Sequence, residues 1–267
     1  MLLTPSQKII ARDTHRFRVA NCGRRFGKTI LASEEIKGKA ISDEVRIAYI
    51  APTYGQARDI IWQVLIKELK DVAVKINESR LEIEVRNVKG TTSIIQLRGW
   101  ESIETLRGQK FHFIVIDEVA MMKNFWVYWQ EVIIPTLTDT KGEVLFTSTP
   151  KGFNHFYELY NLENTNEHWK SFHFTTYDNP HIDDDEIDKL KAQMTEDRFA
   201  QEYMGEFKRV EGLVYKEFNR DKHIYKELPA LNWVEKIVGV DFGFTNPTAV
   251  YLIYKDYDNR YWICLLY

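Results

Sequence analysis

Residues 22 to 29 of the chain read Cys-Gly-Arg-Arg-Phe-Gly-Lys-Thr, a composition suited to holding phosphate groups. The spacing fits the phosphate loop G-x-x-x-x-G-K-[ST], except that Cys22 takes the first position, a modest mismatch for a residue with a Cβ atom. Backbone N–H groups would surround the phosphates, Lys28 would neutralise them, and the Thr29 hydroxyl would bind Mg²⁺. An ordinary strand–turn–helix is the alternative. The candidate nucleotide-binding residues of the loop are Cys22, Gly23, Arg24, Arg25, Phe26, Gly27, Lys28 and Thr29.

A second chemical signal lies at residues 113 to 118, which read Phe-Ile-Val-Ile-Asp-Glu. The apolar run Phe111–Ile116 predicts a buried parallel strand, and Asp117 falls at its carboxyl end, where open α/β sheets bind ligands. Asp117 would hold Mg²⁺, and Glu118 would orient and deprotonate the attacking water. The two carboxylates could instead cap a helix that starts at Met121. The phosphate loop upstream weakens that alternative, so the sequence predicts a chain that binds and hydrolyses ATP.

Three hydroxyl groups follow another apolar run, where Thr147, Ser148 and Thr149 precede Pro150. At the end of a neighbouring strand, a Ser-Thr pair could hydrogen-bond the γ-phosphate or the attacking water. A plain strand end with a turn at Pro150 explains the same residues equally well.

These groups need a framework, and the apolar pattern predicts one. Strands are expected at Phe17–Cys22, Val45–Ala51, Ser93–Leu97, Phe111–Asp117 and Glu143–Ser148. Helical periodicity covers Lys28–Lys39, Tyr54–Lys70 and Asn124–Thr136. Strands that alternate with helices predict an α/β fold with a mainly parallel sheet and flanking helices, a P-loop NTPase of the type with an additional strand and a catalytic glutamate (ASCE). Residues 80–86 and 93–97 could form a hairpin.

The pattern changes after Pro150, which divides the expected domains. Helices are predicted at Phe153–Leu162, Asp184–Gln193 and Glu196–Gly205, and three short strands at Ile237–Phe242, Thr248–Tyr254 and Tyr261–Tyr267. We expect an ATPase core at residues 1–152, a small helical lid or linker subdomain at 153–232, and the first strands of a truncated domain at 233–267.

Composition bounds the class of protein. The 267 residues suffice for one large α/β domain with part of another. No apolar run approaches the roughly 20 residues that cross a bilayer, and no signal peptide opens the chain, so no membrane partner is expected. Cys22 and Cys264 cannot build a disulfide framework, which fits a reducing cytoplasm. A net charge of −3 does not indicate a nucleic-acid binder, and the acidic run at residues 183–188 reads as a solvated helix start.

Several segments fall into the order that one family shows. The chain resembles the large terminase subunit of tailed bacteriophages, the motor that pumps DNA into procapsids, and the resemblance covers essentially its whole length. The segments that carry it are Thr4–Gln7, Cys22–Thr29, Ala51–Ala57, Leu106–Gly108, Asp117–Glu118, Thr147–Pro150, Phe199–Tyr203 and Val238–Gly243.

The resemblance implies roles for particular residues. Gln7 is placed like the adenine-reading glutamine of helicase-like ATPases, and the family pattern tolerates a non-glycine at Cys22. Arg24 is the phosphate-loop arginine acting in cis, and Thr147, Ser148 and Thr149 form the coupling motif that senses hydrolysis. Asp241 is the first metal ligand of a ribonuclease-H-like nuclease that uses Mg²⁺ or Mn²⁺. Its partners would lie beyond residue 267, so we expect no DNA cleavage; an Asx-turn at Asp241 is the alternative.

Arg107 is the candidate arginine finger. It precedes the strand that ends at Asp117, and about 3.3 Å per residue puts it some 20 to 30 Å from Glu118. It would therefore complete the site of an adjacent subunit and stabilise the charge that develops on the transferring phosphoryl group. A surface arginine in a weak salt bridge is the alternative. An isolated monomer is accordingly expected to be a poor ATPase.

As implied by the resemblance, the partners are double-stranded DNA, a portal protein, a small terminase subunit and further copies in a homo-oligomeric ring, expected to be a pentamer. The protein would act in the host cell cytoplasm, with an endonuclease in the full-length protein. A helicase-type DNA-dependent ATPase and a non-hydrolysing nucleotide-binding scaffold are the alternatives. DNA contacts should come from scattered basic residues, although a solvated hairpin rim explains the following equally: Arg80, Arg86, Lys89, Arg98 and Lys110.

Overall fold

The computed structural model describes residues 2–208, 220–225, 227, 232–242 and 249–265. It divides into two compact units, Met1–Glu211 and Gly212–Tyr267, which are described separately. Some predicted residues lie outside the described part of the chain. They are the strand ends Thr248, Leu266 and Tyr267 and the motif residue Gly243.

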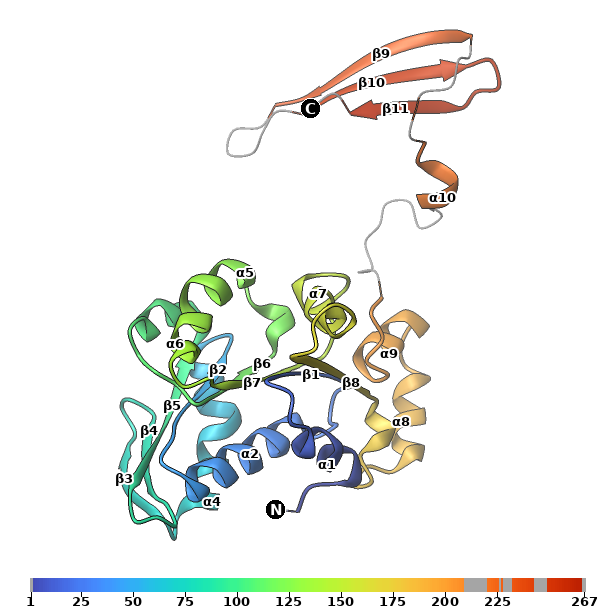
Figure 1. Cartoon of the computed structure of the whole chain (residues 1–267). Coiled ribbons are helices and arrows are strands. Elements are labelled where there is room, and N and C mark those ends of the chain that lie inside the picture. Colours follow the sequence, from blue (N-terminus) through green and yellow to red (C-terminus); the bar gives the residue numbers. More distant parts are fainter. Residues whose placement is uncertain (1, 209–219, 226, 228–231, 243–248, 266–267) are drawn as a thin grey trace. The chain divides into compact units, whose positions relative to one another are not determined.

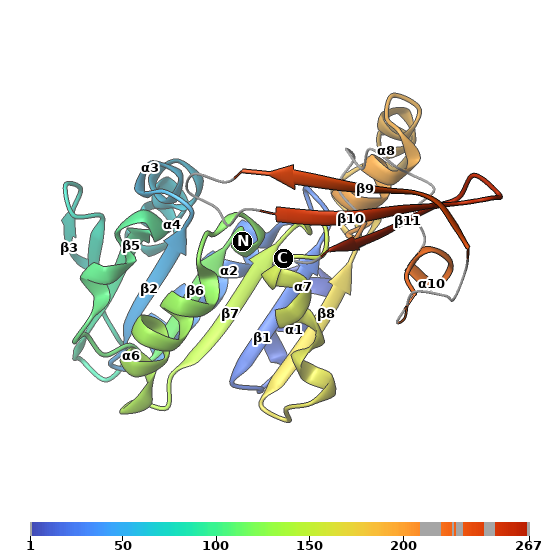
Figure 2. The ribbon, with the colours of Figure 1, turned by 90° about the horizontal axis from the view of Figure 1, so that it is seen from above.

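An eight-stranded sheet forms the first unit, with the strand order β3-β4-β5-β2-β6-β7-β1-β8 (Figure 2). The pairs that join β5, β2, β6, β7, β1 and β8 are all parallel, while β3, β4 and β5 pair antiparallel. The strands are β1 (Phe17–Cys22), β2 (Arg46–Ala51), β3 (Ala73–Asn77), β4 (Glu82–Arg86), β5 (Thr92–Gly99), β6 (Phe113–Asp117), β7 (Glu143–Ser148) and β8 (Trp169–Phe174). The carboxyl ends of β1, β6, β7 and β8 therefore meet at one edge.

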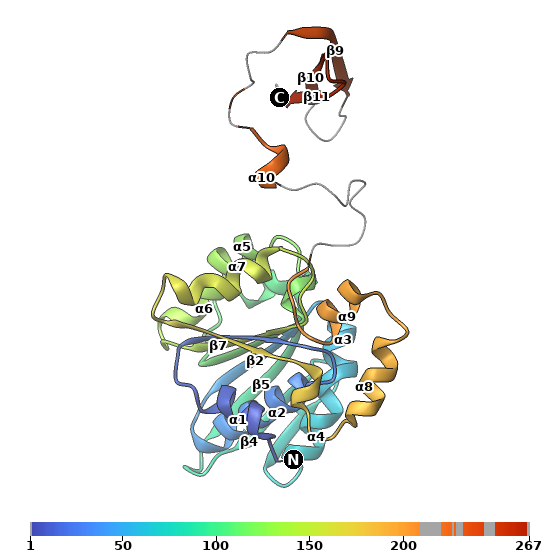
Figure 3. The same ribbon diagram turned by 90° about the vertical axis from the view of Figure 1, so that its right-hand side faces the viewer.

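Helices cover both faces of this sheet, and Figures 1 and 3 show the same layers. One face carries α1 (Pro5–Arg12), α2 (Lys28–Ser42), α3 (Tyr54–Ala57) and α4 (Gln63–Leu69). The other carries α5 (Phe125–Tyr128), α6 (Ile134–Thr138) and α7 (His155–Asn161), with a 3₁₀ segment at Trp100–Leu106. Single π-helical turns, Arg58–Trp62 and Trp129–Ile133, join α3 to α4 and α5 to α6. Two more helices, α8 (Asp184–Lys191) and α9 (Glu196–Glu202), follow β8.

Successive side chains of a buried strand point to opposite faces of the sheet, which explains why helices cover both faces. In β2, Ile47 and Tyr49 belong to the apolar cluster with α2 and α4, whereas Ala48 and Ile50 belong to the cluster with the aromatic side chains of α5 and its neighbours. Every one of these four side chains is 0% exposed, as expected for a parallel strand covered on both faces.

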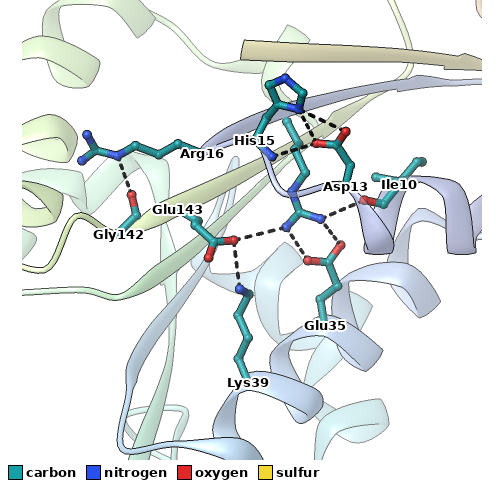
Figure 4. A network of polar contacts seen from close by, with 9 residues as sticks. Ile10, Asp13, His15, Arg16, Glu35, Lys39, Gly142 and Glu143 are labelled. Carbon is teal, nitrogen blue, oxygen red and sulfur yellow. Dashed lines mark hydrogen bonds and ion pairs between the residues drawn. The ribbon is translucent and has the colours of Figure 1, made fainter. Parts of the chain in front are cut away.

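A buried ion pair ties the elements that carry the phosphate loop (Figure 4). The Arg18 guanidinium of β1 is 1% exposed; it donates to the Ile10 carbonyl of α1 at 2.9 Å and to both carboxylate oxygens of Glu35 of α2 at 3.0 and 2.5 Å. Glu143 of β7 lies 3.8 Å away and also accepts from Lys39 at 2.9 Å. Burial raises the pKa of Glu35, and the Arg18 charge opposes that shift. Removing one partner of such a pair costs about 3–5 kcal/mol.

The second unit contains a three-stranded antiparallel sheet in the order β11-β10-β9 and one short helix, α10 (Arg220–His223). Its strands are β9 (Trp233–Asp241), β10 (Ala249–Asp256) and β11 (Tyr261–Leu265). Their register aligns Val238 with Leu252 and Ile253 with Ile263.

The structure confirms the predicted α/β fold, the mainly parallel sheet and the hairpin that β4 and β5 form. Strands β3 and β8 and helix α1 were not among the predicted elements, and β8 brings residues 169–174 into the sheet beside β1. The division at residues 152 and 232 stays a prediction. Among the described residues, no helix has the length and apolar composition that a membrane span requires.

Candidate nucleotide-binding site

The phosphate loop connects β1 to α2 in a conformation that glycine permits. Gly27 has φ 98° and ψ 32° and forms the N-cap of α2. The backbone angle therefore favours glycine, and a Cβ atom at Gly27 would lie 2.3 Å from the side-chain nitrogen of Gln7 and displace that side chain. Phe26 is fully buried and stacks on Phe174 of β8, with ring centroids 5.2 Å apart. The loop is thus anchored in the core.

Gln7 holds the back of this loop. In α1, Thr4 and Gln7 form a capping box, in which the Gln7 side-chain oxygen accepts from the Thr4 backbone at 2.9 Å. Its amide nitrogen donates to the carbonyls of Phe26 at 3.2 Å and Gly27 at 3.1 Å. Gln7 therefore positions the loop in this structure, and its reading of adenine stays a prediction.

Lys28 lies at the centre of the site. Its ammonium donates to the Thr149 hydroxyl at 2.9 Å and to the Cys22 carbonyl at 3.4 Å, and lies 4.0 Å from a carboxylate oxygen of Glu118. The Thr149 hydroxyl donates to the same Cys22 carbonyl at 3.2 Å. Thr149, directly after β7, is therefore bonded to the phosphate loop, and the coupling role of Thr147, Ser148 and Thr149 stays a prediction. Burial raises the pKa of the Cys22 thiol to about 12, so this cysteine is inert at neutral pH.

Asp117 ends β6 as an anion held by three donors. Its carboxylate is 4% exposed; it accepts from the Tyr49 hydroxyl and the Thr147 hydroxyl, both at 2.5 Å, and from the Glu118 backbone at 3.0 Å. Burial and the Asp117 charge raise the pKa of Tyr49, so the phenol stays protonated and donates. Fixed carboxylate oxygens suit a hard cation such as Mg²⁺. The Thr29 side chain, at the start of α2, lines the same cleft as Glu118.

Glu118 turns out of the strand into the cleft. Its backbone is left-handed, with φ 53° and ψ 43°, which is unfavourable for glutamate. Burial raises the pKa of its carboxyl group, the Lys28 charge opposes that shift, and the Asp117 charge adds to it. Backbone strain and a perturbed carboxyl group occur together at functional sites.

Residues from far along the chain form the outer wall of a cleft of about 620 Å³ around the loop. The Arg24 backbone donates to the Glu202 carbonyl at 2.7 Å, and the Thr176 hydroxyl donates to the Arg24 carbonyl at 2.7 Å. The Asn179 side chain donates to the Arg25 carbonyl at 2.6 Å. The wall lining comprises Asn179, Ile182 and Tyr203.

The Arg24 side chain meets a carboxylate of this wall. Its guanidinium pairs with Glu202 at the end of α9, and this hydrogen bond raises the pKa of Arg24. The Arg24 side chain is 60% exposed, so the pair is worth at most about 1 kcal/mol. Arg24 lines the cleft and its side chain contacts Glu202; its role at a bound phosphate stays a prediction.

The remaining predicted residues lie elsewhere. Arg107 is exposed; its guanidinium pairs with Glu104 and, at 3.3 Å, with Glu131, and it does not line the nucleotide cleft. Ser148 accepts from the Ala120 backbone at 3.1 Å and so fixes the turn after Glu118. The finger role of Arg107 stays a prediction.

Asp241 ends β9 in the other unit, where it is exposed. The described residues contain no cluster of three or more His, Cys, Asp or Glu side chains arranged to hold a metal ion. The nuclease-ligand role of Asp241 stays a prediction.

Sequence reasoning missed five residues of the site: Tyr49, Asn179, Ile182, Glu202 and Tyr203. Two of them had a local signal, since Glu202 and Tyr203 lie in the segment Phe199–Tyr203 that carried part of the family resemblance. Tyr49 looks like any core residue of a buried strand.

The fold and site define a class before any comparison. β7 is inserted between the phosphate-loop strand β1 and the acidic strand β6, and Glu118 follows Asp117, which are the additional strand and the glutamate of the ASCE type of P-loop NTPase. Residues 19–222 match the family described as terminase large subunit, T4likevirus-type, N-terminal. The chain belongs to the terminase large subunit family.

Similar proteins agree with this assignment. The terminase large subunit of Escherichia phage T5 is 31% identical over 256 residues, which cover 91% of this chain and 57% of that protein. That of Thermus virus P23-45 is 27% identical over 97% of this chain and 61% of its own length. The chain thus spans less than two thirds of the length of these relatives.

Solved structures show the same fold. The large terminase ATPase domain of Thermus phage P74-26 has a TM-score of 0.66 and 28% identity, covering 78% of this chain and 94% of that chain. The large terminase of another thermophilic bacteriophage, which has also been solved with ADP and with ATP-γ-S, has a TM-score of 0.68 and 20% identity, covering 99% of this chain and 69% of that chain.

Proposed function

We propose that this chain is an ATP-driven motor subunit that translocates double-stranded viral DNA into a procapsid. The observation that carries the ATPase assignment is the convergence of Lys28, Thr149 and Glu118 beside the phosphate loop, with the Lys28 ammonium 2.9 Å from the Thr149 hydroxyl and 4.0 Å from the Glu118 carboxylate. Membership of the terminase large subunit family supports the motor assignment.

Mg²⁺ would be held by the Thr29 hydroxyl and Asp117, whose carboxylate is already oriented by Tyr49 and Thr147. When bound, the ion neutralises charge on the phosphate oxygens. The loop N–H groups and Lys28 bind the β- and γ-phosphates, because α2 directs its N-terminus toward them. Glu118 orients the attacking water and takes its proton, since its raised pKa makes it a stronger base than an ordinary glutamate.

Two arginines would stabilise charge as the phosphoryl group is transferred. Arg24 acts in cis from the cleft wall, and Arg107 acts on the site of the neighbouring subunit. Thr149 then reports hydrolysis to β7, because its hydroxyl joins Lys28 to the Cys22 carbonyl.

Assembly and partners extend this proposal. The motor would be a homo-oligomeric ring, a pentamer, that meets a portal protein and a small terminase subunit in the host cytoplasm, while the chain in isolation is a monomer. Residues 153–232 act as the lid or linker subdomain. Asp241 opens a nuclease site that uses Mg²⁺ or Mn²⁺ in the whole protein, and purified 1–267 does not cut DNA. Metal-dependent cleavage that disappears in Asp241→Ala would refute that last statement.

The test is phosphate release with and without double-stranded DNA, for the wild type and Glu118→Gln. The wild type should hydrolyse ATP faster with DNA, and Glu118→Gln should bind ATP but lose about 10²–10⁴-fold in turnover. Equal turnover in both proteins would refute the base assignment. Unwinding of a forked duplex would identify a strand-separating ATPase instead.

A further inference from the structure

A second polar cleft lies over the β4–β5–β2 side of the sheet, away from the phosphate loop. Its volume is about 520 Å³. Three arginines line it: Arg46 at the start of β2, Arg80 just before β4, and Arg98 near the end of β5. We call it the arginine cleft. Neutral residues and one acid, Glu82, form most of the remaining lining.

The positive charge of the arginine cleft is not balanced by its surroundings. Three arginines and one glutamate give the lining a formal charge of +2. Throughout the described chain, no carboxylate lies at ion-pair distance from any of the three guanidinium groups. By contrast, Lys89 pairs with Asp43 at 2.8 Å and Lys110 with Asp139 at 2.5 Å, although both were candidates for binding DNA. Only part of the predicted basic region therefore keeps its charge available.

The Arg98 guanidinium is held in place by neutral acceptors. It donates to the Leu97 carbonyl at 2.7 Å, the Arg80 carbonyl at 3.1 Å and the Gln96 side chain at 3.0 Å. Burial lowers the pKa of Arg98. The Glu82 charge and Tyr54 oppose that shift, and the charges of Arg80 and Arg46 add to it. Three like charges in one cleft are unfavourable until an anion binds among them. The cleft is thus preorganised for an anion.

The spacing of the arginines indicates a ligand with several charges. Arg46 pairs with Ile94 across β2 and β5, and Arg98 lies four positions further along β5. At about 3.3 Å per residue, the two backbone positions are about 13 Å apart along the strand. A single small anion does not span that length, whereas a nucleic-acid duplex carries one charge per about 1.7 Å of its axis.

We propose that the arginine cleft binds phosphate groups of the double-stranded DNA backbone. Guanidinium groups bind phosphate oxygens through two parallel hydrogen bonds and hold their charge at every physiological pH. The inference rests on the proposed function, because that function supplies DNA as the substrate. Contact with the backbone alone carries no sequence preference, which suits a motor that moves along any sequence.

The experiment measures binding of a fluorescent 30-base-pair duplex by anisotropy over a range of salt concentrations. The test variants are Arg80→Gln and Arg80→Gln/Arg98→Gln. Because Arg80 is exposed, its single variant folds even if the substitution of half-buried Arg98 does not. Arg86→Gln is the matched control, since Arg86 is an exposed arginine of β4 outside the cleft.

The double variant should bind DNA about tenfold more weakly than the wild type. The slope of log affinity against log salt should become about 2 less steep, one for each lost phosphate contact. Arg86→Gln should change affinity by less than about twofold. Phosphate release without DNA should be the same in all four proteins, because none of these residues lines the nucleotide cleft.

The remaining outcomes of this experiment also distinguish DNA binding at the arginine cleft from its alternatives. Equal DNA affinity in all four proteins would overturn the proposal, and so would a wild type that binds neither DNA nor inorganic phosphate. Phosphate binding that the double variant loses, without any DNA binding, would assign the cleft to a free anion and overturn the proposal. A change in self-association with unchanged DNA binding would assign the cleft to a second copy and overturn the proposal. Absent ATP turnover with cleft-dependent DNA binding would refute the proposed ATPase and leave this inference standing.

Discussion

The Glu118 carboxyl group has to be ionised to accept a proton from water. Burial raises its pKa above the 4.5 of an ordinary glutamate, so the ionised form is lost at a higher pH as acid is added. Turnover should therefore fall as the pH drops through this raised pKa, while ATP binding persists. The measurement is kcat against pH, with nucleotide affinity measured in parallel. An inflection at or below the ordinary glutamate range would contradict the role of Glu118 as the base.

The Tyr49 hydroxyl orients the proposed magnesium ligand Asp117, to which it donates at 2.5 Å. Tyr49→Phe keeps the ring in the core and removes one hydrogen bond. Loss of such a supporting contact should weaken metal affinity by about 10–100-fold. The readout is the Mg²⁺ concentration that half-saturates phosphate release. Tyr54→Phe is the control, because its hydroxyl donates to the exposed Ser79 carbonyl. Equal Mg²⁺ dependence in the two variants would show that Tyr49 only packs.

At the scale of elements, the proposed role of Arg24 implies that helix α9, through Glu202, would compete with the nucleotide for the Arg24 side chain. Glu202→Gln removes the carboxylate that holds this guanidinium. Because Arg24 is largely exposed, its pair with Glu202 is worth at most about 1 kcal/mol. The free energy of ATP binding can improve by no more than that amount, so ATP should bind up to about fivefold more tightly. Glu196→Gln, at the other end of α9, is the control. Weaker ATP binding by Glu202→Gln would mean that Glu202 instead orients Arg24 for the phosphate.

The strands were predictable where nearly all of their side chains are buried, because such strands read as continuous apolar runs. Phe17–Cys22 and Glu143–Ser148 were predicted with the bounds that the structure shows, because their apolar runs belong to strands covered on both faces. β8 was missed because Lys170 and His173 interrupt its apolar pattern. An edge strand needs only part of its side chains buried, so its local signal is weak.

The site was predictable only where one segment carries the chemistry. Lys28, Asp117 and Glu118 follow from local motifs, and the structure brings them to one edge of the sheet. The role of Tyr49 depends on the register that sets it opposite Val115, and the contact of Glu202 with the loop joins distant parts of the chain. Such tertiary contacts leave no periodicity to read.

At the scale of the whole molecule, the position of Arg107 predicts activity that depends on assembly. Arg107 lies on the surface, away from its own cleft. Specific activity of the wild type should rise with protein concentration, while Arg107→Ala should stay flat and fall about 10³–10⁵-fold below the assembled wild type. Lys110→Ala, a nearby surface cation paired with Asp139, is the control. Full turnover by assembled Arg107→Ala would make the residue an ordinary surface arginine.

The place of β1 in the sheet has a consequence for biosynthesis. β1 lies between β7 and β8. The strand of this sheet that is synthesised first therefore pairs with the two strands that are synthesised last. At about 5–20 residues per second, the 152 residues from Cys22 to Phe174 take on the order of ten seconds to synthesise. Val19 and Ala20, fully buried in the folded unit, have no neighbouring strand until β7 has been synthesised, and their second neighbour, β8, follows later still. The nascent chain therefore exposes an apolar strand until its neighbouring strands have been synthesised, which makes it prone to aggregation during synthesis.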